Sequence, residues 1–147
     1  MKRASIVTHQ IDVGQLISAV RSAQHGAISV FVGAVREVND GRSVSGIEYS
    51  AYAAMAHQEM ERIVAEAESA FGVSAIVVEH RIGVLDVGDT SIAIVCAHAH
   101  RAAAMDSTRY IIEEIKKRVP IWKMEQYTDG TREWVDPTRS AGQVSAV

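Results

Sequence analysis

The chain has 147 residues, 48% of them hydrophobic and 22% charged, a length that suits one domain with its own core and is short for two. Its 15 Lys and Arg face 18 Asp and Glu, and the formal charge of -3 argues against a general surface for nucleic acid or acidic membranes, although a local basic pocket is compatible with it. The single cysteine, Cys96, excludes a disulfide framework within the chain and a cysteine-rich zinc site.

The first part of the chain predicts a strand, a helix and a second strand. The β-branched residues within 3–8 are typical of a strand. Asp12 is a candidate N-cap for a helix that the spacing of apolar side chains carries to about His25. The nearly continuous apolar run at 27–35 is typical of a strand that is buried on both faces.

A polar stretch rich in turn formers follows at 37–46, and Asn39-Asp40-Gly41 is its strongest turn signal. We expect a mobile loop here, which is also a candidate lid over a substrate. A strand is expected next at 47–52. Apolar residues at helical spacing then predict a helix at 53–71, which Gly72 ends.

The next part predicts three strands and a helix. Two β-branched, apolar runs at 73–80 and 90–97 indicate buried strands, and 81–89, with its two glycines, indicates a short strand between turns. A helix is expected at 101–118, because its apolar side chains recur at helical spacing and Pro120 cannot continue it.

The last predicted element is a hairpin of two strands, 121–127 and 131–135, around the turn Thr128-Asp129-Gly130. We expect one domain over residues 1–137 and a flexible tail at 138–147, which lacks a core pattern. The varied connections and recurrent hairpin signals favour an α+β fold, with a mixed or antiparallel sheet and flanking helices, over a regular doubly wound one.

Basic side chains concentrate near the end of the helix at 101–118. An ordinary solvated helix end accounts for Lys116, Lys117 and Arg118, because cations there complement the helix dipole. It accounts less well for Lys123, which lies between apolar neighbours in a predicted strand. A lysine that is partly desolvated, or close to another cation, can lose its proton near neutral pH and act as a base or nucleophile. Both interpretations stay open on the residues alone.

A second cluster, Cys96-Ala-His98-Ala-His100-Arg101, joins a buried strand to the start of a helix. Backbone amides at a helix N-terminus bind anions and Arg101 would add a bidentate partner, so a phosphate or carboxylate site is one interpretation. The alternative is a metal on His98 and His100, for which no third ligand is identifiable. Arg36 follows a buried strand at its carboxyl end, where ligands often bind in α/β sheets. Cys96 is expected to be a buried structural thiol.

Five motifs in register resemble the large, catalytic subunit of molybdopterin synthase. In chain order they are FVGAVR at 31–36, EYSAYAAMA at 48–56, HRIGVLDVGD at 80–89, AHAHRAAA at 97–104 and IKKRVPIWKMEQYTDGTREWV from 115 onward. The similarity extends from about Ser29 to Val135. One departure is Ser50, where that family usually has an acidic residue, and it bears on local packing.

The resemblance implies an enzyme, a sulfurtransferase that makes molybdopterin from cyclic pyranopterin monophosphate by adding the two sulfurs of the dithiolene. It also implies a partner, a small ubiquitin-like subunit whose C-terminal glycine carries the sulfur as a thiocarboxylate. Two large subunits would form the central homodimer of a heterotetramer, in a fold with a hammerhead-like β arrangement. No cofactor or metal is implied for this step. Because no apolar run approaches the roughly 18 residues that span a bilayer, and no signal peptide is recognisable, we expect a cytoplasmic protein.

By the same resemblance the catalytic pair, seven residues apart across the proline, falls on Lys116 and Lys123, with Lys117 as an adjacent rival. Two other classes of function stay open: a non-catalytic adaptor that keeps the docking surface, and an unrelated phosphate-binding enzyme with a metal. Besides the two lysines, the substrate-binding positions implied by the resemblance are Arg36, His100, Arg101, Met124 and Glu125.

The predicted helix separates two of these positions. Arg101 and Lys116 are 15 residues apart, so their Cα atoms lie about 22 Å apart on one helix. One pterin phosphate cannot bridge that distance. We therefore expect a pocket shared across the dimer, with Lys116 and Lys123 from one subunit and His100 and Arg101 from the other.

Overall fold

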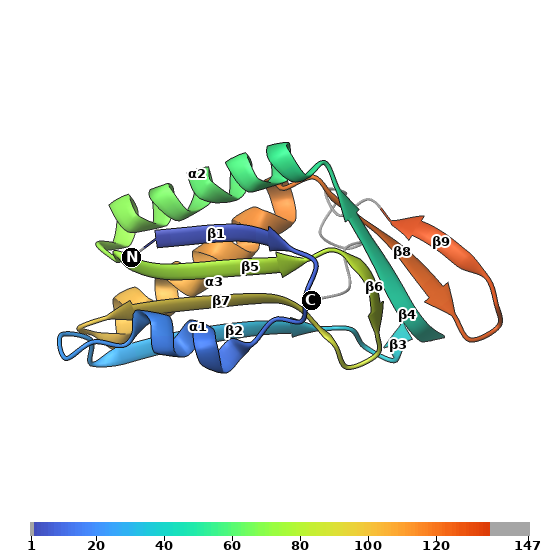
Figure 1. The fold of residues 1–147 in the computed structure, drawn as a ribbon, viewed down its shortest axis with the longest axis horizontal. Coiled ribbons are helices and arrows are strands. Elements are labelled where there is room, and N and C mark those ends of the chain that lie inside the picture. The colour runs from blue at the N-terminus through green and yellow to red at the C-terminus, as the bar shows by residue number, and fades with distance from the viewer. Residues whose placement is uncertain (1, 136–147) are drawn as a thin grey trace.

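A four-stranded sheet forms the larger part of the protein, whose computed structural model describes residues 2–135 (Figure 1). Its strands are β1 (Lys2–Val7), β5 (Ala75–Arg81), β7 (Thr90–His98) and β2 (Ala27–Ala34), in that order. β1 pairs with β5 in parallel, and the other pairs are antiparallel. The predicted α+β fold with mixed pairing is thereby confirmed. The expected domain limit at 137 and tail at 138–147 lie outside the described residues.

Helices cover both faces of this sheet (Figure 1). The helix α1 (Val13–Val20) packs on one face, where Leu16 and Val20 meet the inward side chains of β5 and β7. The helices α2 (Ala53–Phe71) and α3 (Arg101–Arg118) pack on the other face and against each other, over the main hydrophobic core. None of the helices within residues 2–135 combines the length and the apolar run needed to cross a membrane.

The helix α1 ends five residues earlier than predicted. Asp12 caps its start, since the carboxylate accepts a hydrogen bond from the Gln15 amide at 3.1 Å. At the other end the backbone of Arg21 is extended, and the His25 ring bonds the Val20 carbonyl at 2.8 Å. The expected continuation to His25 was wrong, because residues 22–25 form a turn that satisfies the last carbonyl of the helix from outside it.

The second sheet lies beyond one end of the first and carries the carboxyl-terminal strands (Figure 1). Its order is β3-β4-β8-β9, and β6 also pairs with β4. The bounds are β3 (Val38–Asn39), β4 (Arg42–Ala51), β6 (Gly83–Asp86), β8 (Ile121–Tyr127) and β9 (Arg132–Val135). Pro120 separates α3 from β8, as predicted.

The mobile loop expected at 37–46 is instead a tight β-hairpin. Asn39 pairs with Arg42 across a two-residue turn, in which Asp40 and Gly41 have φ of 50° and 75°. This is the conformation for which Asp-Gly is favoured in hairpins. The turn signal was correct, but the prediction of a loop was wrong because β3 is only two residues long and the first residues of β4 are mostly polar, so neither shows an apolar alternation.

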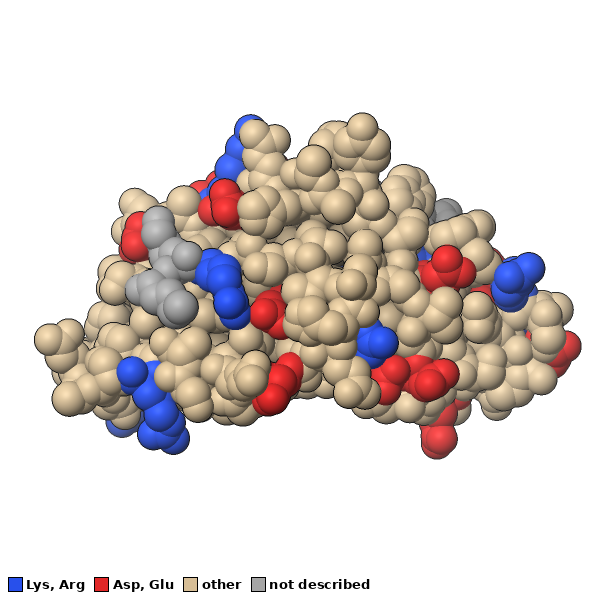
Figure 2. Space-filling model, viewed as in Figure 1, with Lys and Arg blue, Asp and Glu red and all other residues tan. Residues whose placement is uncertain are grey.

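Charged side chains of both signs are interspersed over the face of the protein seen in Figure 2. Figure 2 shows Lys and Arg near Asp and Glu on this face, with broad uncharged areas between them. The face in view therefore carries no extended basic surface of the kind that nucleic acids require.

Candidate active site

The strand β8 sends charged side chains into the interior of the protein. Its residues alternate, so Lys123 and Glu125 face inward, at 3% and 1% exposure, while Trp122 faces outward at 46%. The Lys123 ammonium lies 3.3 Å from Glu125 Oε1. Among residues 2–135, Lys123 Nζ finds no hydrogen-bond partner of good geometry, and the charge of Glu125 is what balances its own. Two buried charges on one strand need compensation from neighbouring elements.

That compensation converges on the carboxylate of Glu125. Asn39 donates to Oε1 at 2.5 Å from the β3–β4 hairpin, and the Tyr127 hydroxyl donates to Oε2 at 2.8 Å. Burial by itself raises the pKa of the Glu125 carboxyl, but these two hydrogen bonds and the charge of Lys123 outweigh it, and the pKa ends below its usual value. The site therefore holds a fixed anion.

Three cations lie close to one another at this site, and one of them, Lys123, forms the ion pair with the anion. Burial lowers the pKa of Lys123, with a further contribution from the positive charge of Arg36. Burial also lowers the pKa of Lys116 to about 8, helped by the charges of Lys123 and Arg36. The structure thus brings Arg36, Lys116 and Lys123 into one electrostatic neighbourhood, from the segment after β2, the last turn of α3 and β8. A lysine whose pKa is near 8 can exchange a proton near neutral pH.

A buried histidine lies close to this group. His80, at the end of β5, packs edge-on against Tyr49 with ring centroids 5.3 Å apart, and its Nδ1 bonds the Arg81 carbonyl at 2.9 Å. Burial lowers the pKa of His80 to about 4, and the charge of Lys116 adds to this. His80 is therefore neutral at pH 7. The sequence has no spacing that singles out His80 as part of the site.

Asn39 is a further site residue that sequence reasoning missed, as is Tyr127. Asn39 accepts a hydrogen bond from Arg36 at 3.1 Å while it donates to Glu125. Its turn-forming neighbours placed it in an expected loop, where an asparagine is ordinary. A recognisable signal was available, since an Asp-Gly pair between two extended segments indicates a hairpin whose flanking residues face each other.

The last turn of α3 is held from outside the site. Lys117 points to solvent with an ion pair to Glu114 at 3.5 Å, which separates it from Lys116. Arg118 binds Glu66 through two nitrogens, at 2.6 and 3.0 Å, and also Glu59 at 2.8 Å. Because Glu59 and Glu66 belong to α2, these ion pairs of Arg118 fix the end of α3 that carries Lys116.

Two of the expected substrate contacts lie elsewhere. His100 and Arg101 are exposed at the opposite end of α3, so the structure does not bring them to the lysines within one chain. The backbone amide of His100 donates to the His98 ring at 3.0 Å. Residues 2–135 contain no group of three or more His, Cys, Asp or Glu side chains placed to hold a metal ion, so the alternative of a metal on His98 and His100 gains no third ligand.

Met124 occupies the outer face of β8. It pairs with Trp134 of β9, on the side of the sheet opposite Lys123 and Glu125. The structure therefore separates Met124 from the buried charges of its own chain. Cys96 is buried, as expected, and burial raises the pKa of its thiol.

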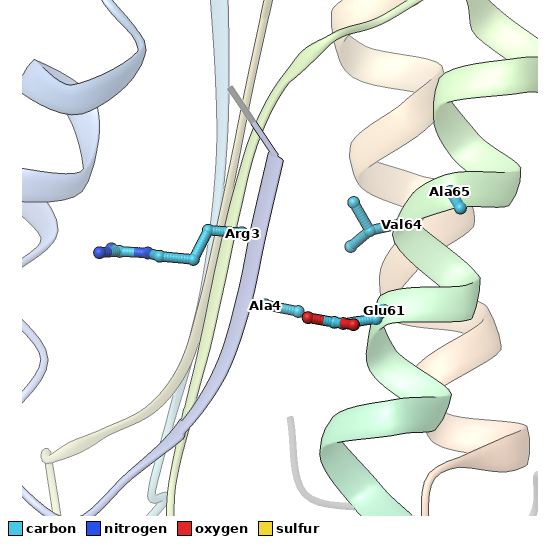
Figure 3. A pocket seen from close by; sticks show the side chains of 5 residues that line it. All are labelled: Arg3, Ala4, Glu61, Val64 and Ala65. Carbon is cyan, nitrogen blue, oxygen red and sulfur yellow. The ribbon is translucent and has the colours of Figure 1, made fainter.

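A cavity elsewhere in the molecule shares no residue with this site. It lies between β1 and α2, as Figure 3 shows. The Arg3 side chain points to the side of the sheet away from α2, and Glu61 reaches from α2 toward Ala4. Its lining residues are Arg3, Ala4, Glu61, Val64 and Ala65. No cluster of converging polar groups accompanies it, in contrast to the group around Glu125.

Comparison with known proteins gives a consistent result. The profile of the family described as MoaE protein matches residues 6–118. A molybdopterin synthase catalytic subunit of Bacillus subtilis is 39% identical, over 92% of this chain and 85% of its own length. One from Oryza sativa subsp. indica is 37% identical, over 93% of this chain and 74% of its own.

Solved structures agree with the sequence matches. The crystal structure of molybdopterin synthase from Staphylococcus aureus superposes with a TM-score of 0.85 at 34% identity, over 92% of this chain and 98% of the other. A protein–protein complex of subunits 1 and 2 of molybdopterin-converting factor from Helicobacter pylori matches with a TM-score of 0.74 at 26% identity, over 90% of this chain and 89% of the other.

Proposed function

The chain belongs to the MoaE family, and from this premise we propose that it is the catalytic subunit of a molybdopterin synthase. In this role it transfers sulfur from the thiocarboxylated C-terminus of a small ubiquitin-like subunit to cyclic pyranopterin monophosphate, in molybdenum cofactor biosynthesis. Each transfer leaves the carrier with an ordinary carboxylate, in which oxygen has replaced the sulfur. The reaction belongs in the cytoplasm.

The observation that carries this proposal is the cluster of Arg36, Lys116 and Lys123, in which Lys123 is paired with the fixed anion of Glu125. Both reactants are anions, one a thiocarboxylate and the other a phosphate ester. Arg36 suits the phosphate, because a guanidinium binds phosphate oxygens in a planar, bidentate manner. Lys123 stabilises the charge that develops at the carbonyl during sulfur transfer.

Lys116 has the properties of the group that moves protons. Its pKa of about 8 leaves protonated and neutral forms both populated near neutral pH. Ring opening and loss of water each require a proton to be given or taken. Lys123, whose counter-charge lies 3.3 Å away, is better suited to remain an ammonium.

The remote pair, His100 and Arg101, serves the site of a second subunit in this proposal. The length of α3 keeps Arg101 about 22 Å from Lys116 in their own chain, and His100, which precedes the helix, lies at the same far end. A homodimer within a heterotetramer would supply them from the partner chain. Mixed dimers of an Arg101→Ala chain with a Lys123→Ala chain test this, because half of their sites would then be intact. Activity no higher than that of the two parent variants would contradict sharing.

Single-turnover conversion of cyclic pyranopterin monophosphate tests the function itself. The assay combines this protein with a thiocarboxylated small subunit and compares Lys116→Ala and Lys123→Ala, with the exposed Lys117→Ala as the matched control. We expect dithiolene product from the wild type and Lys117→Ala, and a loss of about a hundredfold or more in the other two variants. No product from the wild type, despite binding of the small subunit, would instead favour a non-catalytic adaptor.

A further inference from the structure

One side chain of the β3–β4 hairpin, Asn39, is buried although the hairpin lies at the edge of its sheet. Both the nitrogen and the oxygen of its side-chain amide form hydrogen bonds. The nitrogen donates to Glu125 Oε1 at 2.5 Å, and the oxygen accepts from the Arg36 guanidinium at 3.1 Å. A single neutral group therefore lies between a cation and an anion of the site and bonds both.

Few other side chains can make this bridge. An ionised aspartate has no donor for Glu125, a leucine of similar size has neither donor nor acceptor, and a serine is shorter. The amide also carries no charge, so it orients Arg36 and Glu125 without neutralising either of them. Arg36 keeps its positive charge for an anionic substrate, and Glu125 keeps its negative charge for Lys123.

The hairpin and the neighbouring strand enclose this bridge. Tyr127 donates to the second oxygen of Glu125 at 2.8 Å, and the Arg42 guanidinium lies 3.4 Å from the centre of the Tyr127 ring. Arg42 is the residue that pairs with Asn39 across the turn. The same two-residue turn therefore fixes the donor to one carboxylate oxygen and covers the donor to the other.

We propose that Asn39 is a positioning residue of the sulfur-transfer site, whose amide fixes Arg36 and Glu125 relative to each other and, through Glu125, fixes Lys123. The proposal rests on the proposed function for its effect on catalysis. Its structural content, the dependence of Lys123 on Asn39, is independent of that function. Asn39 need not touch either substrate.

Two substitutions distinguish the hydrogen bond of Asn39 to Arg36 from its hydrogen bond to Glu125. Asn39→Leu removes both hydrogen bonds, so we expect kcat to fall and the KM for the pterin to rise, each by about tenfold. Asn39→Asp keeps an acceptor for Arg36 but faces Glu125 with a second carboxylate. We expect it to keep KM within about threefold while kcat falls by about tenfold or more. A merely structural role would not divide KM from kcat in this way.

Two matched controls accompany these variants. Val38→Ala alters an exposed residue of the same hairpin whose side chain lies on the face opposite to Asn39, and we expect wild-type kinetics from it. Tyr127→Phe removes one of the two donors to Glu125, and we expect kcat to fall about threefold with KM unchanged. Circular dichroism and gel filtration verify that each variant is folded before it is assayed.

A second readout needs no turnover. The sequence contains four lysines, so protein labelled with ¹³C at the lysine ε-carbons gives few resonances, and the titration of Lys123 can be followed by NMR. Its charged surroundings are Glu125 and Asp40, which favour the ammonium, and Arg36 and Lys116, which oppose it. In Asn39→Leu we expect the titration midpoint of Lys123 to move upward, because Arg36 is released and Glu125 is free to close on Lys123.

The outcomes are distinguishable. Unchanged kcat, KM and Lys123 titration in folded Asn39→Leu overturn the positioning role. A wild-type enzyme that makes no product overturns the proposed function, and in that case the Lys123 titration alone decides whether Asn39 positions this lysine. A shifted titration then supports the role, and an unshifted one rejects it.

Discussion

The strands β7 and β8 occupy the same place in their respective sheets, each with a neighbour on both sides, yet they bury opposite kinds of side chain. Seven consecutive residues of β7 are buried, and they are apolar except for Ser91. β8 buries alternate residues, and two of these, Lys123 and Glu125, are charged. The difference follows from the layers around them, since helices cover both faces of β7, whereas in residues 2–135 β8 has protein packed on one face.

This contrast separates stability from function within one small protein. Burial of β7 removes apolar surface from water on both faces and stabilises the fold. Burial of Lys123 and Glu125 carries a desolvation cost, which Asn39 and Tyr127 offset through hydrogen bonds. We expect changes in β7 to act on stability alone, and changes in the inward residues of β8 to act on stability in a pH-dependent way and on activity.

The largest effect on stability is expected in β7. Ile94→Ala leaves a cavity in the main core and should lower the free energy of unfolding by about 3–4 kcal/mol, equally at pH 7 and pH 9. Urea denaturation at fixed protein concentration measures this, with Ile94→Val as the milder control at about 1 kcal/mol. The contrast between the strands fails if the loss depends on pH, or if activity per folded molecule also falls.

Removing the buried anion of β8 should lower the free energy of unfolding by less than Ile94→Ala does, and the size of this loss should depend on pH. Glu125→Gln keeps the size of the side chain but leaves the Lys123 ammonium without its counter-charge, so we expect a loss of about 2–3 kcal/mol at pH 7. The loss should shrink at pH 9.5, because the stranded lysine then gives up its proton more easily. Urea curves at the two pH values measure the difference. If the loss of stability were the same at both pH values, the charge of Lys123 would play no part in that loss.

Replacing Lys116 should raise the free energy of unfolding at neutral pH, whereas replacing Glu125 should lower it. Its pKa falls from 10.5 when unfolded to about 8 when folded, so between these values the unfolded chain binds more protons and the wild type gains stability as the pH rises. Lys116→Met removes this dependence and should be more stable than the wild type at pH 7 by about 1 kcal/mol. The difference should narrow and vanish toward pH 10.5. Lys117→Met, at an exposed position, should show no such trend.

The smallest effect is expected on the outer face of β8. Trp122→Gln alters a half-exposed side chain and should change the free energy of unfolding by less than about 0.5 kcal/mol. The same urea experiment measures it. A loss of about 2 kcal/mol or more would show that the outer face of this sheet is covered in the assembled protein, and the difference in layers between β7 and β8 would then be smaller than it is in one chain.

The elements with strong local signals were predicted closely. The apolar run of β7 and the pair of Asp12 and Pro120 marked a strand, a helix start and a helix end that the structure confirms. The strand at 27–35 was expected to be buried on both faces, but β2 is the last strand of its sheet and has exposed side chains such as Val30 and Val32. The end of α1 and the hairpin at 37–46 were also missed. Both depend on hydrogen bonds from polar side chains and on a short turn, which leave no apolar periodicity to read.

The candidate site was predictable in part. Alternation along β8 places Lys123 and Glu125 on one face, but it does not tell which face is buried. The contact between Asn39 and Glu125 joins positions 86 residues apart, and no local pattern encodes it. The lysine pair was reached through the resemblance of motifs, while its surroundings needed the fold.

The parallel pairing of β1 with β5 dictates an order of events during synthesis. Lys2 pairs with Ile76 and Val7 with Arg81, so β1 has no partner until β5 has been synthesised, some seventy residues later. β5 in turn needs β7, and β7 pairs with β2, so the sheet closes after residue 98 has emerged. Contacts so distant along the chain form slowly. A nascent chain that stops before β7 therefore presents unpaired strand edges, and such edges are prone to aggregate.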